Sequence, residues 1–333
     1  MTDQAPRALV LGATGHIGQA IVRELLAHGW RVTAATRQPR AEALAGLDVT
    51  VAAGDADSPG QLVDWVAGHS VVFDAAAPYP MNLFLRAAEA DRAPLAHARR
   101  RMTGLLDSVG RAGAVLVHVS SYTTLPRPAG EGALAALETR ARRRLHPYFA
   151  VKAEMESMVL AAGRQGLRAV VLNPSACMGP WDRRPRDLCV VPLLISQQVP
   201  ALVSQALNVI DVRDVALAAR LAVEQQRYGA PMALAGHNTR TDSLAQRVCE
   251  LGGVAAPRRR LPARLAAGGM LWTEAGWALL GRASPVPALG SLLVLDGYAM
   301  QTGPAQRDLG VWPRPLDDTL RDAIAWYRSI GSC

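Results

Sequence analysis

The chain has 333 residues, half of them hydrophobic, and a formal net charge of +8 at pH 7. This length suits one large domain or two lobes, and the composition provides a sizeable buried core. The four cysteines form no Cys-x-x-Cys pair, and no His, Asp or Glu cluster has metal-ligand spacing, so we predict neither a disulfide framework nor a metal site.

Most of the positive charge comes from arginine, with short runs at 99–101, 140–144, 183–186 and 258–260. The runs contain no interleaved aromatic residues and match no known nucleic-acid motif. We therefore interpret them as solvated faces and predict no nucleic-acid partner. The first 15 residues lack the apolar stretch of a signal peptide, which favours a cytoplasmic protein.

Six short apolar or β-branched runs alternate with helical segments in the first half of the chain. They cover 7–12, 30–36, 48–54, 70–76, 114–120 and 167–173. Continuous apolar strands separated by helices predict an α/β fold with a doubly wound parallel sheet, the Rossmann fold. A strand and a helix are expected in 208–225 and another strand in 230–236.

These patterns predict two parts of the chain. We expect a dinucleotide-binding domain over 1–175, to which 208–236 returns, and a smaller C-terminal substrate-binding lobe over 176–207 and 237–333. Within the lobe, the apolar stretch 265–281 contains Glu274 and falls short of the roughly 20 residues that span a bilayer. We interpret it as a substrate lid or core helix and predict no stable membrane insertion.

Three glycines follow the first predicted strand, in the stretch "LVLGATGHIGQAIV". Gly12, Gly15 and Gly18 lie at the mouth of an amphipathic helix, where backbone N–H groups can approach a pyrophosphate. The alternative is a tight strand-to-helix turn without a ligand. We predict a dinucleotide site, to which Thr14, His16 and Ile17 also contribute.

The second predicted strand ends without the Asp or Glu that would accept a hydrogen bond from the ribose of NAD. Arg37 follows instead, with Arg40 three residues later. A guanidinium matches a 2′-phosphate with paired hydrogen bonds, so we predict NADP(H) rather than NAD. The alternative is that Arg37 stacks on the adenine or faces water.

A serine pair and a Tyr-x-x-x-Lys sequence indicate a catalytic site. Ser120 and Ser121 end the fifth predicted strand, and Tyr148 and Lys152 open the next long helix. Ligands of open α/β sheets bind beyond the carboxyl ends of the strands, and residues four apart share a helix face. Lys152 is the single lysine of the chain. We expect its ammonium to favour the phenolate form of Tyr148, so that this tyrosine exchanges protons near neutral pH.

Three features carry a resemblance to a known family: the Gly-x-x-Gly-x-x-Gly spacing, the segment "GDADSPGQL" and the later "YFAVK". With these features, the sequence resembles the extended short-chain dehydrogenase/reductase family, the NAD-dependent epimerase/dehydratase superfamily. The likeness is to its branch of dihydroflavonol reductases, 3β-hydroxysteroid dehydrogenases and hopanoid-associated proteins. The resemblance implies a Ser121, Tyr148 and Lys152 triad, with Lys152 also on the nicotinamide ribose. It implies an adenine contact for Asp55, while Asp57 is expected to cap the next helix.

The remaining contacts are expected near the strand ends. The cofactor contacts are Ala56, Ala75, Ala76, Tyr148, Lys152, Pro174 and Ser175, and the substrate contacts are Ser121, Tyr148, Met178 and Trp181. Ser120 is expected to bond the backbone, and His118 and His146 to be structural.

Three positions depart from the family pattern. Asn173 precedes Pro174 where many members have arginine, and Ala98 stands where an asparagine is usual. Ala176 occupies the place of an asparagine that binds the diphosphate in sugar-nucleotide epimerases. The last departure counts against a sugar-nucleotide substrate.

The function predicted first is NADPH-dependent reduction of a ketone or aldehyde on a largely apolar small molecule, or the reverse oxidation. A second hypothesis is an NDP-sugar epimerase or dehydratase with retained NAD, in which Arg183, Arg184 and Arg186 bind the diphosphate. A third is a non-catalytic dinucleotide-sensing regulator, which the fold alone allows. Each hypothesis is compatible with a homodimer.

Overall fold

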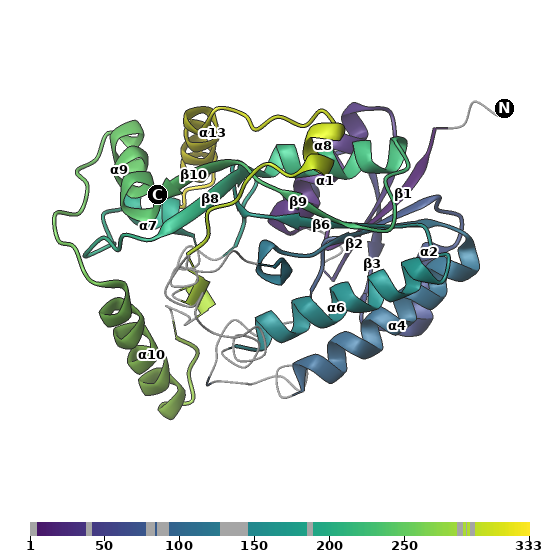
Figure 1. Cartoon of the computed structure of the whole chain (residues 1–333), viewed down its shortest axis with the longest axis horizontal. Coiled ribbons are helices and arrows are strands. Elements are labelled where there is room, and N and C mark those ends of the chain that lie inside the picture. The colour runs from purple at the N-terminus through teal and green to yellow at the C-terminus, as the bar shows by residue number, and fades with distance from the viewer. Residues whose placement is uncertain are drawn as a thin grey trace.

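The structure, a computed structural model, describes residues 5–37, 42–77, 84, 93–126, 146–184, 189–284, 289–290, 292–293 and 297–333. A seven-stranded sheet with helices on both faces forms its larger part, and a three-stranded sheet lies beside it (Figure 1).

The larger sheet is parallel throughout, in the order β3-β2-β1-β4-β5-β6-β9. Its interior strands are buried on both faces, which explains why the sequence shows continuous apolar runs rather than alternation. This confirms the predicted doubly wound sheet. The strands are β1 (Arg7–Leu11), β2 (Arg31–Thr36), β3 (Val49–Ala53), β4 (Val71–Asp74), β5 (Val115–Val119), β6 (Ala169–Pro174) and β9 (Pro231–Leu234).

Two layers of helices cover this sheet (Figure 1). One face carries α1 (His16–Ala27) and α8 (Val212–Glu224), whose alanines and aliphatic residues share a core with β1, β4 and β5. The opposite face carries α2 (Pro59–Val66), α4 (Pro94–Ala112) and α6 (Pro147–Arg164). Short 3₁₀ turns, η1 (Glu42–Leu44) and η2 (Tyr122–Thr124), follow β2 and β5.

The smaller sheet has the order β10-β8-β7, with β7 parallel and β10 antiparallel to β8. Segment 208–236, expected to return to the dinucleotide-binding domain, is divided: β8 lies in the smaller sheet, whereas α8 packs on α1 and β9 extends the larger sheet. The elements are β7 (Ala176–Met178), β8 (Ala206–Asp211), β10 (His237–Arg240), α7 (Val190–Ile195), α9 (Thr241–Gly252), α10 (Ala263–Leu279), α12 (Pro304–Asp308) and α13 (Leu316–Ser329).

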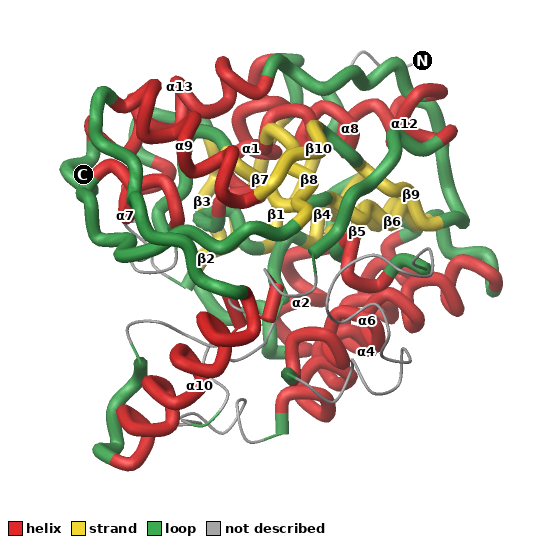
Figure 2. Tube along the Cα trace, turned by 60° about the vertical axis from the view of Figure 1, so that its left-hand side comes forward, coloured by secondary structure: helices red, strands yellow, loops and turns green. Residues whose placement is uncertain are grey.

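Helix α10 extends away from both sheets (Figure 2). Within the described part of the chain, no helix combines the length and apolar character needed to cross a membrane.

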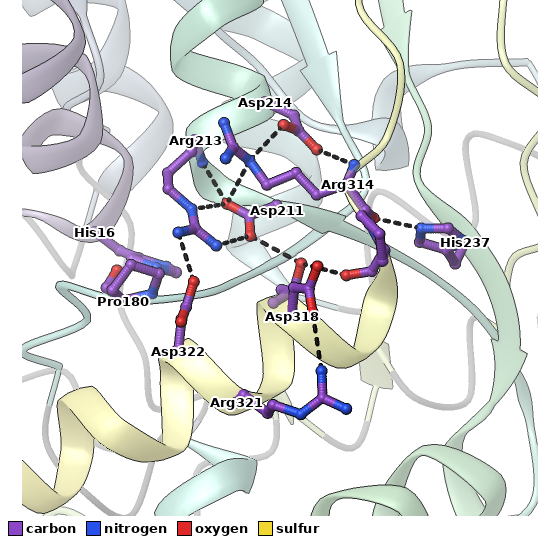
Figure 3. Close-up of polar contacts among 12 residues, drawn as sticks. His16, Pro180, Asp211, Arg213, Asp214, His237, Arg314, Asp318, Arg321 and Asp322 are labelled. Carbon is purple, nitrogen blue, oxygen red and sulfur yellow. Dashed lines mark hydrogen bonds and ion pairs between the residues drawn. The ribbon is translucent and has the colours of Figure 1, made fainter.

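A charged cluster around Asp211 attaches α13 to the rest of the fold (Figure 3). Asp211 caps α8 by accepting from the Arg213 N–H at 2.8 Å, and it also accepts from Arg213 Nη2 at 2.7 Å and from the Thr319 hydroxyl at 2.8 Å. Arg213 Nη1 in turn donates to Asp322 at 2.6 Å. Burial alone would raise the pKa of Asp211, but the hydrogen bonds from Arg213 and Thr319 lower it overall.

Candidate active site

The glycine turn after β1 brings backbone close to backbone. Gly12 has a φ of +74°, and a Cβ there would lie 3.0 Å from the Ala75 carbonyl carbon and from the Ala76 nitrogen. A Cβ on Gly18 would lie 2.0 Å from the Gly12 oxygen, so α1 can pack this close to the turn only with glycine. Gly15 is the N-cap residue of α1. The turn therefore leaves the helix N-terminus open to a pyrophosphate.

A cavity of about 200 Å³ lies beyond the carboxyl ends of β1 to β4. Arg37 is exposed at its edge, directly after β2. The predicted cofactor residues that line this cavity are Gly12, Thr14, Arg37, Asp55, Ala56 and Ala76. Arg40 lies outside the described residues.

Asp57 also lines this cavity, but it does not cap α2 as expected. Ser58 precedes that helix without a side-chain cap, and the Asp57 carboxylate instead lies 2.8 Å from His97 Nε2 and 3.4 Å from Arg101 Nε. Both partners lie on α4, so the Asp57 carboxylate contacts that helix and not the N-terminus of α2.

A second cavity, of about 490 Å³, lies beyond β5 and β6 and reaches the smaller sheet. The predicted residues that line it are Gly15, His16, Ile17, Ala75, Ser121, Tyr148, Lys152, Pro174, Ser175 and Met178. Gly18 and Trp181 do not line this cavity. Gly18 packs against the Gly12 backbone instead. The Trp181 ring is covered by Arg23, whose guanidinium carbon is 4.9 Å from the ring centre.

Ser121 and Tyr148 meet inside this cavity. The Tyr148 hydroxyl donates to Ser121 Oγ at 2.9 Å, although the residues are 27 positions apart. Ser121 also accepts from the Thr123 N–H at 3.2 Å, which fixes the start of η2. His146 holds the other end, because its Nδ1 accepts from the Tyr148 N–H at 3.1 Å and so caps α6.

Lys152 lies one helical turn beyond Tyr148 and is only 8% exposed. Its Nζ donates to the Val119 carbonyl oxygen at 3.0 Å, at the end of β5. Burial lowers the pKa of Lys152 to about 8, while the carboxylates of Asp74 and Glu156 oppose this shift. The Lys152 side chain therefore lines the cavity wall and releases its proton more readily than an ordinary lysine.

Glu156 organises the base of the site, a role that sequence reasoning missed. Its carboxylate accepts from Asn173 Nδ2 at 2.7 Å, from Thr124 Oγ1 at 2.6 Å and from Ser120 Oγ. Ser120 thus bonds a side chain, not the backbone as expected. Asn173 fills the position of the family's arginine by bonding this carboxylate from β6.

A buried charged cluster underlies the space between the two cavities. Arg101 on α4 is 2% exposed and donates through Nη2 to Asp74 at 2.5 Å. His118 Nδ1 lies 3.0 Å from the same carboxylate. Burial would raise the pKa of Asp74, but Arg101 and His118 hold it well below its usual range. The run 99–101 is therefore not a purely solvated face: Arg99 and Arg100 are exposed, and Arg101 is an interior residue.

Asp182 joins distant elements at the rim of the larger cavity. It accepts from Arg184 Nε at 2.9 Å and from the Tyr327 hydroxyl of α13 at 2.9 Å, and it lies 3.8 Å from His16 Nδ1 on α1. Burial lowers the pKa of His16 to about 4, so this imidazole is neutral at pH 7. Nothing in the local sequence around Asp182 pointed to a partner 145 residues away.

The residues present fit a dinucleotide. The hydroxyl of Ser175, at the end of β6, is buried in the cavity wall and has no hydrogen-bond partner among the described residues. A carboxamide group beside it would supply one. Among the same residues, no group of three His, Cys, Asp or Glu side chains could hold a metal ion.

Comparison with known proteins agrees with this geometry. The model of the NAD dependent epimerase/dehydratase family matches residues 8–233. A sterol demethylase protein B from Methylococcus capsulatus is 30% identical, over 97% of this chain and 98% of that protein. A putative dihydroflavonol 4-reductase from Synechocystis sp. is 28% identical, over 97% and 94%.

The structure of a nucleoside-diphosphate-sugar epimerase from Pseudomonas aeruginosa superimposes with a TM-score of 0.76 at 22% identity and covers 99% of both chains, which shows a shared fold. The family model extends over the glycine turn, the whole lining of the smaller cavity, most of the lining of the larger one and the residues Ser121, Tyr148 and Lys152. Because this family is NAD dependent, the cofactor of the chain is a nicotinamide dinucleotide. The chain therefore belongs to the NAD dependent epimerase/dehydratase family, as an enzyme of the extended short-chain dehydrogenase/reductase type.

Proposed function

We propose that this enzyme is an NADP(H)-dependent oxidoreductase that reduces a ketone or aldehyde group on a largely apolar small molecule, or oxidises the corresponding alcohol. The observation that carries the proposal is the 2.9 Å hydrogen bond between Tyr148 and Ser121 in a cavity that also contains Lys152. These are a proton donor, a group that can hold an oxygen, and a cation. Carbonyl reduction needs all three.

In the proposed reaction, a bound nicotinamide dinucleotide supplies the hydride. Tyr148 donates its phenolic proton to the carbonyl oxygen, and Ser121 holds that oxygen by a hydrogen bond. Lys152 stabilises the resulting phenolate, because its ammonium lies in a buried wall where charges interact strongly. Asn173 and Glu156 position the strand ends from which Ser121 projects.

The walls away from the catalytic residues favour an apolar substrate. Met178, Val190, Val191, Leu207 and Leu293 line the cavity and offer no hydrogen bonds from their side chains. A sugar placed against them would bury hydroxyl groups without partners, each at a cost of roughly 1–3 kcal/mol. A hydrophobic ketone has one polar atom to satisfy, and Tyr148 and Ser121 satisfy it.

The choice of NADP(H) rests on Arg37. Its side chain lines the smaller cavity directly after β2, where an NAD enzyme needs an acidic side chain to bind the ribose. Asp57 in that cavity is already paired with His97 and Arg101. Arg37 is therefore available for a 2′-phosphate.

The NDP-sugar hypothesis depends on an arginine for the diphosphate, and Arg184 does line the larger cavity. Its Nε and Nη2 groups, however, donate to Asp182 at 2.9 and 2.6 Å, so this guanidinium is already paired with a carboxylate. Arg183 pairs with Glu42, and Arg186 lies outside the described residues. Membership of an enzyme family also counts against the dinucleotide-sensing regulator.

The test is a direct comparison of substrates. Purified enzyme is assayed for NADPH oxidation with hydrophobic ketones and aldehydes and for binding of NDP-sugars, and small molecules retained after native purification are identified by mass spectrometry. We expect turnover of apolar carbonyl compounds and no retained NAD. Tight binding of NDP-sugars alone, with NAD retained in the purified protein, would instead establish the epimerase or dehydratase activity.

A further inference from the structure

Helix α10 presents an apolar face to solvent. Leu265, Trp272 and Leu279 are 67%, 81% and 89% exposed, and their spacing of seven residues places them on one side of the helix. Both views show this helix standing apart from the two sheets (Figures 1 and 2). The three large apolar side chains therefore lie in a row along one exposed side of the helix, the apolar stripe, and are not scattered around it.

The opposite face of α10 carries the acidic residue of the helix. Glu274 is buried, and its carboxylate accepts from the Phe84 N–H at 3.0 Å, while Ala267 is buried beside it. An ordinary surface helix turns its charged residues outward and its apolar residues inward. Helix α10 instead buries its one carboxylate and exposes three large apolar side chains, an arrangement that favours a partner other than water on its outward face.

The exposed charges around α10 are positive, which favours an anionic partner. Between 257 and 282 the chain has one acidic residue, the buried Glu274, and five exposed arginines: Arg258, Arg259, Arg260, Arg264 and Arg282. Four lie at the N-terminal end of the helix and one follows its C-terminal end. Arg260 is 3.3 Å from Asp242. The other four arginines place positive charge at both ends of the apolar stripe.

We propose that α10 docks this enzyme on an anionic membrane surface. The 17-residue helix would lie in the plane of the interface, with Leu265, Trp272 and Leu279 at the boundary of the acyl chains and the arginines among the phosphates. Tryptophan favours this boundary because its ring is apolar and its N–H is polar. Docking of this kind needs no membrane-spanning segment.

A second copy of the chain fits the stripe less well. Two such surfaces would bring ten exposed arginines together without an exposed acidic residue from the same segment. A protein partner would also need a surface with shape complementarity. Gly269 and Gly276, which have no side chains, lie between the three large residues and offer few features for such packing. A lipid surface needs no shape complementarity.

The docked helix would also border an apolar route to the catalytic residues, a step that rests on the proposed function. A cavity of about 230 Å³ lies between Ala266 and Met270 of α10 and Leu194 and Leu202 of the smaller lobe. Val190 lines both this cavity and the catalytic one. An apolar substrate dissolved in the bilayer would thus enter beside α10 and reach the catalytic cavity past Val190.

The docking test needs neither cofactor nor substrate, so its result is independent of the proposed reaction. Full-length protein is sedimented with phosphatidylcholine vesicles and with 3:1 phosphatidylcholine:phosphatidylglycerol vesicles, at low and high salt. The variants are the triple change Leu265→Ser, Trp272→Ser, Leu279→Ser and the triple change Arg258→Gln, Arg259→Gln, Arg264→Gln. The matched control is Trp312→Ser, which changes a 66% exposed tryptophan elsewhere on the surface.

We expect the parent to bind the anionic vesicles, with an affinity that falls as salt rises. Both triple variants should bind at least about tenfold more weakly, and the Trp312→Ser control should bind like the parent. All the changed side chains are exposed, so thermal unfolding should show that every variant is folded. Brominated lipid should quench the parent fluorescence more than that of Trp272→Phe. The proposal is overturned if the parent ignores anionic vesicles at low salt, or if the serine variant binds like the parent. Loss of a dimer in the serine variant, with no vesicle binding by the parent, would overturn it in favour of a second copy.

Discussion

The hydroxyl of Tyr148 lies 2.9 Å from that of Ser121, so two residues on different elements converge on one point of the larger cavity. Both are buried, Tyr148 at the first turn of α6 and Ser121 just after β5, at the start of η2. A carbonyl oxygen placed within hydrogen-bond distance of both hydroxyls would contact a proton donor and a second hydroxyl at once.

Tyr148→Phe should therefore abolish turnover and leave dinucleotide binding nearly unchanged, because the ring is kept and the proton donor is lost. We expect the catalytic rate to fall about 100-fold or more. The measurements are NADPH oxidation with an accepted carbonyl compound and a fluorescence titration with NADPH. Tyr298→Phe is the control, since this tyrosine stacks on Tyr122 and donates to Pro126. A Tyr148→Phe variant that kept a rate within a few-fold of the parent would rule out the mechanism.

Lys152 should lower the stability of the fold while it serves the reaction. Burial lowers its pKa from the ordinary value of 10.5 to about 8, so the folded state binds the proton more weakly than the unfolded state. The cost is present in full below pH 8 and shrinks as the pH rises from about 8 to 10.5. Lys152→Met removes this cost and should be more stable than the parent at pH 7, by up to about 3 kcal/mol.

Urea unfolding of the parent and Lys152→Met at pH 7, 9 and 10.5 checks this expectation, and the gap should narrow with rising pH. Lys152→Met and Lys152→Arg should both be severely impaired in turnover, because an apolar side chain has no charge and a planar guanidinium fits the compact site poorly. A Met variant that is less stable by the same amount at every pH would show that the Lys152 proton does not govern stability. An active Arg variant would show that an ammonium is not required.

Local patterns were enough to predict the larger sheet, and together with the family resemblance they pointed to Ser121, Tyr148 and Lys152, which line one cavity. The glycine turn, the apolar runs and the spacing of Tyr148 and Lys152 each report on neighbours within one or two elements, and the parallel topology then brings the strand ends together. The cofactor and substrate roles of these residues stay predictions. Ser121 could be favoured over Ser120 by resemblance, and the structure shows Ser121 in contact with Tyr148.

The interior polar clusters could not be predicted, because they depend on contacts across the fold. Arg101 is the last residue of a run that the sequence predicts to be exposed, yet it lies on the inner side of α4 and donates to Asp74 at the end of β4. Glu156 looks like an ordinary helical glutamate until Asn173 and Thr124 are placed against it. Asp182 and Tyr327 are joined only when α13 packs on the loop after β7.

Arg37→Ala should remove the preference for NADPH over NADH. A charge-assisted hydrogen bond to a phosphate is worth about 1.5–3 kcal/mol, so NADPH affinity should fall roughly 10- to 100-fold while NADH affinity changes little. Isothermal titration at two salt concentrations measures both, and parent binding of NADPH should weaken with salt. Arg31→Ala is the matched control, because this exposed arginine starts the same strand at its other end. Equal affinity of the parent for both dinucleotides would refute the assignment.

Asp211→Asn should weaken the attachment of α13 and make the protein's stability less sensitive to acid. The parent carboxylate is buried and holds Arg213 and Thr319, and these hydrogen bonds lower its pKa despite burial. A carboxyl group with a lowered pKa stabilises the fold above its unfolded pKa, near 4, and this contribution is lost as the pH falls through the folded pKa.

At pH 7 the free energy of unfolding of Asp211→Asn should be about 2–4 kcal/mol lower than that of the parent, because the Arg213 guanidinium then faces a neutral partner. The difference should shrink below about pH 4, where the unfolded parent begins to protonate Asp211 while the folded parent does not. Urea unfolding at pH 7, 5 and 3.5 measures it, with Asp322→Asn as the control, because that carboxylate pairs with the same arginine but is 47% exposed. An exposed pair of this kind contributes about 0–1 kcal/mol, so equal losses in the two variants would show that the buried carboxylate is not what holds α13 in place.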